Sequence, residues 1–266
     1  MEKALSSEPT ELGTVGGVKI QPVQSSSSYV NVLIYGESGV GKTVLSGSSS
    51  VIEDMSPTLY LDIEGGGMSL LDFYPNVETA PIKKWAELQA IYDELYRGKS
   101  KYKTVVIDSL TEAQKLAMRD HMAVSSNRDS SIDEDVPQMQ HWLKNIEQMR
   151  RFVRAMRDLP MNVIFTALEA QEKDNRGRWQ TRPSMNGKLQ QELPGFFDLV
   201  LYMYNKTEKV DKQVVTKRML LTKRTDTVQA KDRSNKLPQV IEEPTMEDVY
   251  NIITGKATHA NSSGDN

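Results

Sequence analysis

The sequence predicts an α/β fold in which helices sandwich a mostly parallel β-sheet, and three observations support this prediction. Apolar runs of strand length recur along the chain, at residues 30–35, 58–63, 104–107, 162–167 and 199–203. Amphipathic helical patterns separate several of these runs. Neither an internal repeat nor an obvious linker divides residues 29–254. Strands that alternate with helices are typical of a parallel sheet that is covered on both faces.

Helices are predicted where apolar side chains recur every three or four residues. The first such stripe contains Trp85, Leu88, Ile91 and Leu95. A longer stripe contains Met139, Trp142, Leu143, Ile146, Met149, Phe152, Val153 and Met156. Residues 110–122 show a weaker version of the pattern. We expect the methionine and aromatic side chains of these stripes to pack in the core.

Composition limits the kinds of site that the chain can contain. The 266 residues include no cysteine and three scattered histidines, which excludes disulfides and argues against a metal site built from these residues. No segment is apolar enough to predict a membrane span. The net charge of −3 leaves any nucleic-acid binding to local basic patches. Residues 1–28 and 255–266 are polar, and we expect a flexible arm and tail around one domain at residues 29–254.

A phosphate-binding motif directly follows the first predicted strand. Residues 36–43 read GESGVGKT and match G-x-x-x-x-G-K-[ST] at every fixed position. The glycines let the backbone amides converge on phosphate oxygens, and the helix that follows adds the positive end of its dipole. Lys42 is expected to reach the β- and γ-phosphates, and the Thr43 hydroxyl to bind Mg²⁺. The predicted ATP-binding residues are Gly36, Glu37, Ser38, Gly39, Val40, Gly41, Lys42 and Thr43.

Acidic residues end two further predicted strands. Asp108 follows residues 104–107 and is predicted to hold Mg²⁺ directly or through water, with a helix cap as the alternative. Asp62 and Glu64 are expected on one side of their strand because side chains alternate with a period of two. Glu64 is the predicted base that polarises the attacking water. Two alternatives to this role remain open. The residues could form a charged strand end that leads into a glycine turn, or either of them could hold a substrate hydroxyl, as in small-molecule kinases.

Together these motifs resemble the RecA-type ATPase core in order and approximate spacing. The segments VIFTA at residues 163–167, LPGFFD at 193–198 and AKDR at 230–233 make the chain similar to phage-encoded RecA-like nucleotide-binding proteins of the Sak single-strand annealing group. The resemblance covers roughly residues 30–235. It implies a RecA-like P-loop NTPase core in which the strand at 162–167 lies between the P-loop strand and the Asp108 strand. It also implies that Glu64 is the catalytic base.

The chain departs from the RecA pattern in two places. RecA-type proteins commonly carry an amide pair that senses the γ-phosphate, whereas Ala167 and Leu168 stand here. That switch is therefore absent or moved to Thr166 or Glu169. No polymerisation domain is evident in residues 1–28, so long filaments are not expected. The resemblance implies single-stranded DNA as a partner, a homo-oligomer, a single-strand-binding protein as a further partner, and a location in the cytoplasm of the phage host.

Residues 173–188 form a basic segment with a tryptophan, and this segment is the predicted DNA-binding element. It contains five basic residues and one acidic residue, and Asp174-Asn-Arg-Gly177 predicts the turn of a β-hairpin. Cations can follow the phosphates of a single strand while an aromatic ring stacks on a base. The alternative is a solvated hairpin whose tryptophan packs on the core. The predicted DNA-contacting residues are Arg176, Arg178, Trp179 and Arg182.

A second basic region, residues 205–236, contains ten basic and four acidic residues. Lys231 and Arg233 lie on one side of an extended segment within it. They are predicted to reach the γ-phosphate of a neighbouring subunit, as arginine fingers do. The alternative is a basic strand face that balances the acidic remainder of the chain.

The leading functional hypothesis is a Mg²⁺-dependent ATPase that acts on single-stranded DNA in phage recombination or replication. In-line attack of water on the γ-phosphate would use Glu64 as base, with Lys42 and Mg²⁺ neutralising charge. Two alternatives remain: a small-molecule or nucleotide kinase, and a nucleotide-dependent scaffold with little turnover.

Overall fold

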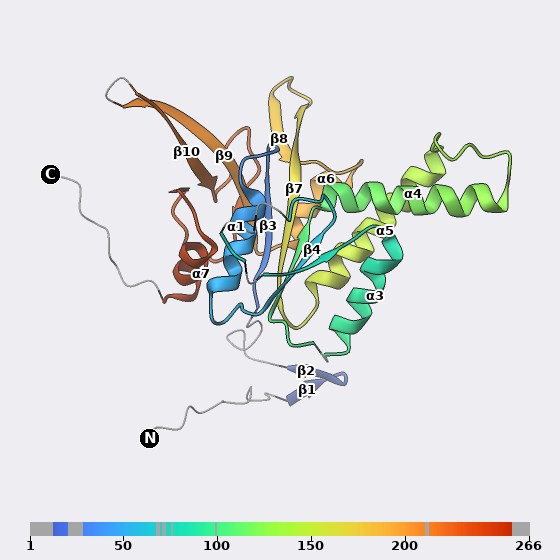
Figure 1. Cartoon of the computed structure of the whole chain (residues 1–266), viewed down its shortest axis with the longest axis horizontal. Helices are drawn as coiled ribbons and strands as arrows, with labels where there is room; N and C mark the ends of the chain where they lie inside the picture. Colours follow the sequence, from blue (N-terminus) through green and yellow to red (C-terminus); the bar gives the residue numbers. More distant parts are fainter. Residues whose placement is uncertain are drawn as a thin grey trace.

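The computed structural model describes residues 13–20, 29–67, 70, 73–75, 77–98, 100–210 and 213–256. A ten-stranded sheet forms the centre of the chain, with the main strand order β12-β10-β9-β3-β7-β6-β4-β5 (Figure 1). These strands are β3 (Asn31–Gly36), β4 (Thr58–Asp62), β5 (Glu78–Pro81), β6 (Thr104–Asp108), β7 (Asn162–Lys173), β9 (Leu199–Val210), β10 (Gln213–Leu221) and β12 (Val240–Glu242). The five neighbouring strand pairs from β9 to β5 are parallel, whereas β10 and β12 are antiparallel. The predicted fold class is confirmed.

All five predicted strands form, and they lie next to one another in the sheet. The strand β7 lies between β3 and β6, as the resemblance to RecA-type proteins implied. Side chains alternate between the two faces: Leu33 and Tyr35 join one core cluster, whereas Val32 and Ile34 join the other. Both faces of β3 are therefore buried, which explains why its sequence is a continuous apolar run.

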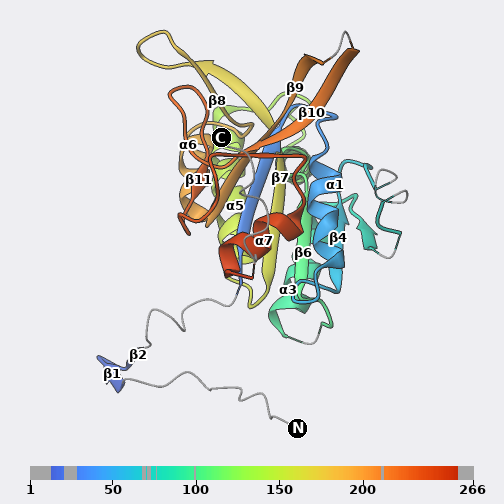
Figure 2. The same ribbon diagram turned by 90° about the vertical axis from the view of Figure 1, so that its left-hand side faces the viewer.

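Helices cover both faces of the sheet (Figures 1 and 2). The three predicted helices cover one face as α3 (Trp85–Tyr96), α4 (Leu110–Arg128) and α5 (Met139–Arg157). The other face is covered by α1 (Lys42–Gly47), the 3-10 helix η2 (Ser48–Val51) and α7 (Met246–Thr254). Shorter elements are α6 (Leu189–Glu192), the 3-10 helix η3 (Leu193–Phe196), β8 (Trp179–Pro183) and β11 (Lys231–Asp232).

The apolar stripe of α5 is only partly in the core. Met149 and Met156 are fully buried, whereas Met139 is 74% exposed and Leu143 is 62% exposed. The prediction that the whole stripe packs in the core is therefore wrong for the first turns of the helix. The cause is the position of the α4–α5 connection, which lies away from the sheet (Figure 1).

Two antiparallel hairpins, β7–β8 and β9–β10, extend beyond the sheet (Figure 2). In the predicted N-terminal arm, residues 13–20 form the strand pair β1 (Gly13–Val15) and β2 (Val18–Ile20). The rest of that arm, and residues 257–266 of the predicted tail, lie outside the described residues. Among the described helices, none has the length and apolar character needed to cross a bilayer.

Replacing Met149 with Ala is expected to lower the free energy of unfolding by about 2–5 kcal/mol, because it leaves a cavity at a fully buried position. Chemical denaturation monitored by circular dichroism measures this change. Met139→Ala, on the exposed first turn of the same helix, is the matched control and should change stability by less than about 0.5 kcal/mol. Equal effects of the two substitutions would contradict the described packing of α5.

Candidate nucleotide-binding site

The phosphate-binding motif forms the turn between β3 and α1. Gly36 ends β3 against β9, where an added Cβ would collide with the carbonyl oxygen of Met203. Gly39 and Gly41 have φ angles of 76° and 106°, which side chains other than glycine rarely adopt. The helix α1 then begins at Lys42. The glycines are therefore required by the path of the loop, which places the first turn of α1 beside the carboxyl end of the sheet.

Lys42 lies inside the loop and is 6% exposed. Its Nζ donates hydrogen bonds to the carbonyl oxygens of Gly36 at 3.0 Å and Glu37 at 2.7 Å. Burial lowers the pKa of Lys42, and the negative charges of Asp108, Glu64 and Glu169 oppose this shift. The ammonium group thus lies where carboxylates at the ends of β6 and β4 and within β7 act on it.

Asp108 is the centre of the polar network and is 1% exposed. Its carboxylate accepts hydrogen bonds from three hydroxyl groups: Thr43 Oγ1 at 2.7 Å, the Tyr60 hydroxyl and Thr166 Oγ1. The two predicted Mg²⁺ ligands, Thr43 and Asp108, are therefore adjacent. The residue that caps α4 is Ser109, whose Oγ accepts from the Glu112 amide at 3.4 Å. The helix-cap alternative for Asp108 is wrong.

Glu64 lies just after the end of β4, next to Asp108 and Ser109. Its amide donates to the Asp108 carbonyl at 3.3 Å, and its carboxylate accepts from the Ser109 hydroxyl. Loss of solvent around the carboxyl raises the pKa of Glu64; the Ser109 hydrogen bond counteracts this shift, and the charge of Asp108 adds to it. The predicted base is thus beside the predicted metal ligand.

Asp62 has a different environment from Glu64. Its carboxylate accepts three backbone hydrogen bonds, from the amides of Gly65 at 2.7 Å, Gly66 at 3.0 Å and Gly67 at 3.1 Å. The strand ends at Asp62, so the alternation that placed Asp62 and Glu64 on one side of a strand does not extend to Glu64. Asp62 shapes the glycine turn that carries Glu64.

Two further groups complete this region of the site. Thr166, one of the two alternatives for the missing switch, bonds to Asp108, and Glu169 lies three residues further along β7. One carboxylate oxygen of Glu169 is buried without a hydrogen-bond partner among the described residues. Tyr60 was missed by sequence reasoning, although a tyrosine within a buried strand is a signal that its hydroxyl needs a partner.

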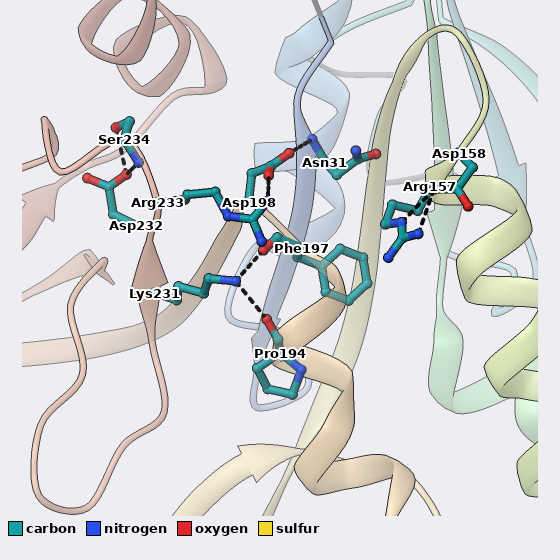
Figure 3. Close-up of polar contacts among 10 residues, drawn as sticks. All are labelled: Asn31, Arg157, Asp158, Pro194, Phe197, Asp198, Lys231, Asp232, Arg233 and Ser234. Atoms are coloured by element: carbon teal, nitrogen blue, oxygen red, sulfur yellow. Dashed lines mark hydrogen bonds and ion pairs between the residues drawn. The ribbon is translucent and has the colours of Figure 1, made fainter. Parts of the chain in front are cut away.

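The structure does not bring Lys231 and Arg233 to the phosphate-binding loop of the same chain. The strand β11 pairs with the amino end of β9, whereas the loop lies at the carboxyl end of β3, which is parallel to β9. Both side chains point toward the segment that precedes β9 (Figure 3). Lys231 Nζ donates to the carbonyl oxygens of Phe197 at 2.7 Å and Pro194 at 3.3 Å. Arg233 forms an ion pair with Asp198 at 2.6 Å.

The basic segment forms the predicted hairpin, β7–β8, with its turn at residues 174–177. Trp179 is 57% exposed, so it does not pack on the core, and the ammonium of Lys173 lies 5.1 Å from its ring centre. Arg178 pairs with Asp174 at 2.9 Å. A polar cavity of about 440 Å³ beside the hairpin is lined by Lys173, Arg176, Arg182 and Arg224, among others. Arg224 was not predicted, because it comes from a distant segment.

The strand order, the glycine-rich loop and the Thr43–Asp108 pair define a RecA-like P-loop ATPase. Residues 28–234 match the family model AAA_24, described as an AAA domain, and the chain therefore belongs to this family. No curated protein matches the chain.

Several solved structures are similar to the chain at low identity. The flagellar accessory protein FlaH from Methanocaldococcus jannaschii has 11% identity and a TM-score of 0.44, over 80% of this chain and 84% of that chain. The RadB recombinase has 16% identity and a TM-score of 0.40, over 72% and 79%. The ATPase EscN of the enteropathogenic E. coli type III secretion system has 17% identity and a TM-score of 0.43, over 66% and 43%. The family assignment depends on the match over residues 28–234 and not on these similarities.

Replacing Lys42 with Ala is expected to abolish tight ATP binding, because the β- and γ-phosphates lose their compensating charge. Titration calorimetry measures the affinity, and Lys83→Ala, which removes an exposed lysine before α3, is the control. Wild-type affinity in the Lys42→Ala protein would contradict the assignment of the loop.

Proposed function

We propose that this ATPase depends on Mg²⁺ and acts on single-stranded DNA in phage recombination or replication, as an annealing or recombinase-like protein. One observation carries the proposal: the single strand β7 belongs to both the nucleotide site and the hairpin. Its first six residues are buried, and among them Thr166 bonds to Asp108. Its last three residues are exposed and lead to the turn before Trp179. A change at Asp108 can therefore reach the proposed DNA-binding element through one hydrogen bond and one continuous strand.

Mg²⁺ fits the residues that are present. The Thr43 hydroxyl and the Asp108 carboxylate are hard oxygen donors, and their oxygens lie 2.7 Å apart. No group of three potential His, Cys, Asp or Glu ligands occurs in the part of the chain that the structure describes. Mg²⁺ commonly binds through one or two protein oxygens and the substrate phosphates, so two donors suffice. When bound, the ion would neutralise charge on the β- and γ-phosphates.

Glu64 is the proposed base for hydrolysis. The Ser109 hydroxyl orients its carboxylate, and the turn closed by Asp62 fixes its backbone. A raised pKa makes the carboxylate a better proton acceptor from the attacking water. Lys42 supplies the positive charge that opposes the charge on the γ-phosphate. Asp62, which already accepts three backbone hydrogen bonds, is poorly placed to hold an acceptor hydroxyl, and this disfavours a kinase that uses Asp62.

The hairpin supports binding to a single strand rather than to a paired duplex. Trp179 offers an exposed ring face for stacking, and an unpaired base offers the complementary face. Arg176, Arg182 and Arg224 line one polar cavity beside it and can follow the phosphates. The chain as a whole has a net charge of −3, so this local patch has to provide the attraction.

The proposal extends to a homo-oligomer in the host cytoplasm, with a single-strand-binding protein as a further partner, as the resemblance to the Sak group implies. Lys231 and Arg233 would act on the nucleotide of a neighbouring subunit. For this, Lys231 has to release two backbone carbonyls and Arg233 has to release Asp198. These contacts make the trans role conditional on a rearrangement at assembly.

Replacing Glu64 with Gln is expected to leave ATP binding intact and to lower turnover by roughly 10²–10⁴-fold, the range for loss of a general base. Single-strand binding in ATP should then persist after the wild type has consumed its nucleotide. Phosphate release with and without oligo-dT, followed by DNA binding over time, measures both effects. Glu53→Gln, at an exposed position, is the control. Wild-type turnover in the Glu64→Gln protein would move the base to Glu169 or Asp62, and loss confined to phosphate transfer onto an acceptor would favour a kinase.

Replacing Trp179 with Ala is expected to weaken single-strand binding by about 1–3 kcal/mol, because one stacked base loses its platform. Trp142→Ala, at a partly exposed tryptophan on α5, is the matched control and should bind DNA normally. Arg176→Ala should lower affinity and flatten its dependence on salt. Fluorescence anisotropy with labelled oligo-dT measures these changes, and unaltered affinity in the Trp179→Ala protein would contradict the proposed interface.

A further inference from the structure

Arg218 of β10 lies against the phosphate-binding loop, on the side away from Asp108. A methyl group built on Gly41 would lie 3.2 Å from Met203 Cε, 3.4 Å from Arg218 Cδ and 3.8 Å from Arg218 Nη1. The Arg218 side chain is 45% exposed, so a ligand in the loop can reach it. No motif in the sequence singles out this residue.

Glu243 holds Arg218 in a fixed orientation. Its carboxylate accepts from the Arg218 amide at 2.8 Å, from Nε at 3.0 Å and from Nη2 at 3.0 Å. The Glu243 amide in turn donates to the Arg218 carbonyl at 2.8 Å. Among the described residues, no acceptor contacts Nη1, which is the guanidinium nitrogen nearest to Gly41. One edge of the guanidinium is thus used for anchoring, whereas Nη1 on the other edge remains available in a side chain that is 45% exposed.

The segment after Glu243 is fixed to the same face of the sheet as α1. Thr245 caps α7, and the amide of Met246 donates to Ser48 Oγ at 2.9 Å. Ser48 directly follows α1, whose first residue is Lys42. Arg218 and the phosphate-binding loop are therefore connected by short, ordered contacts.

The strand order determines which end of a nucleotide faces Arg218. Asp108 and Glu64, at the ends of β6 and β4, lie on the β7 side of β3, whereas β9 and β10 lie on its other side. The γ-phosphate has to face Asp108 and Glu64 for metal binding and hydrolysis, and the loop amides hold the α- and β-phosphates. The nucleoside therefore leaves the loop on the side of Met203 and Arg218.

We propose that Arg218, clamped by Glu243 and flanked by Met203, forms the nucleoside subsite of the ATP site, with the face of its guanidinium packed against the base. The inference depends on the nucleotide binding that the family membership supports. A planar guanidinium stacks on aromatic rings, and a thioether packs well at a ring edge. Contact with the face of the base reads none of its donors or acceptors, so adenine and guanine should bind with similar affinity.

The test compares a nucleotide with its phosphate chain alone. The probes are the non-hydrolysable analogue AMP-PNP and inorganic tripolyphosphate, each titrated with Mg²⁺ into the full chain by calorimetry. Arg218→Ala should weaken AMP-PNP binding by about tenfold, the effect of losing one cation–π contact. Arg218→Lys keeps the positive charge but replaces the planar guanidinium. It should therefore show a similar loss of affinity for AMP-PNP and an unchanged affinity for tripolyphosphate. Lys217→Ala is the matched control, because Lys217 is the preceding residue of β10 and pairs with Glu242.

Turnover gives a second readout: Arg218→Lys should raise KM for ATP and leave kcat unchanged, as expected for an interaction equal in the ground and transition states. Equal losses for AMP-PNP and tripolyphosphate in Arg218→Ala, with full recovery in Arg218→Lys, would overturn the proposal and make Arg218 a phosphate ligand. Unchanged AMP-PNP affinity in both variants would overturn it as well. A wild-type chain that binds tripolyphosphate but not AMP-PNP would exclude a nucleoside subsite. Failure to bind either probe would instead contradict the nucleotide site itself.

Discussion

The rest of the site depends on the hydrogen bonds that the carboxylate of Asp108 accepts. This carboxylate is buried and accepts hydrogen bonds from the hydroxyl groups of Thr43, Tyr60 and Thr166, which belong to α1, β4 and β7. A buried charge is costly unless hydrogen bonds satisfy it, so the three donors and the carboxylate require one another. The network therefore fixes the first turn of α1 relative to two strands. Any ligand that draws Thr43 or Asp108 to itself has to alter this arrangement.

The sequence predicted the strands, the helices and the loop because their signals are local. The apolar runs, the helical stripes and the eight-residue motif can each be recognised within one segment. The contacts of Asp108 with Tyr60 and Thr166 depend instead on strand register, such as the pairing of Tyr60 with Val106, which no single segment encodes. Ser109 caps α4 for a local reason: β6 extends through Asp108 and the helix begins at Leu110, which leaves Ser109 at the cap position.

Strand β7 carries a physical constraint that connects the two proposed activities. Thr166 bonds to Asp108, and the same strand continues from Thr166 to the turn at residues 174–177. Glu169 lies between these two points and has a buried oxygen without a partner among the described residues. A donor supplied by a second arrangement of this strand would satisfy that acceptor. Thr166 and Glu169, the two alternatives for the switch, thus flank Ala167 and Leu168, which stand where RecA-type proteins carry the amide pair.

The two ends of a bound nucleotide would meet different parts of the sheet. The γ-phosphate end faces Asp108, Glu64 and β7, which continues into the proposed DNA-binding hairpin. The nucleoside end faces Arg218 on β10, which is held by Glu243 and linked through α7 to Ser48. Contacts at the nucleoside end stay the same when the γ-phosphate is lost, so they contribute equally to ATP and ADP binding. Discrimination between ATP and ADP, and with it any control of DNA binding, has to arise from Lys42 and from the β4–β6–β7 side.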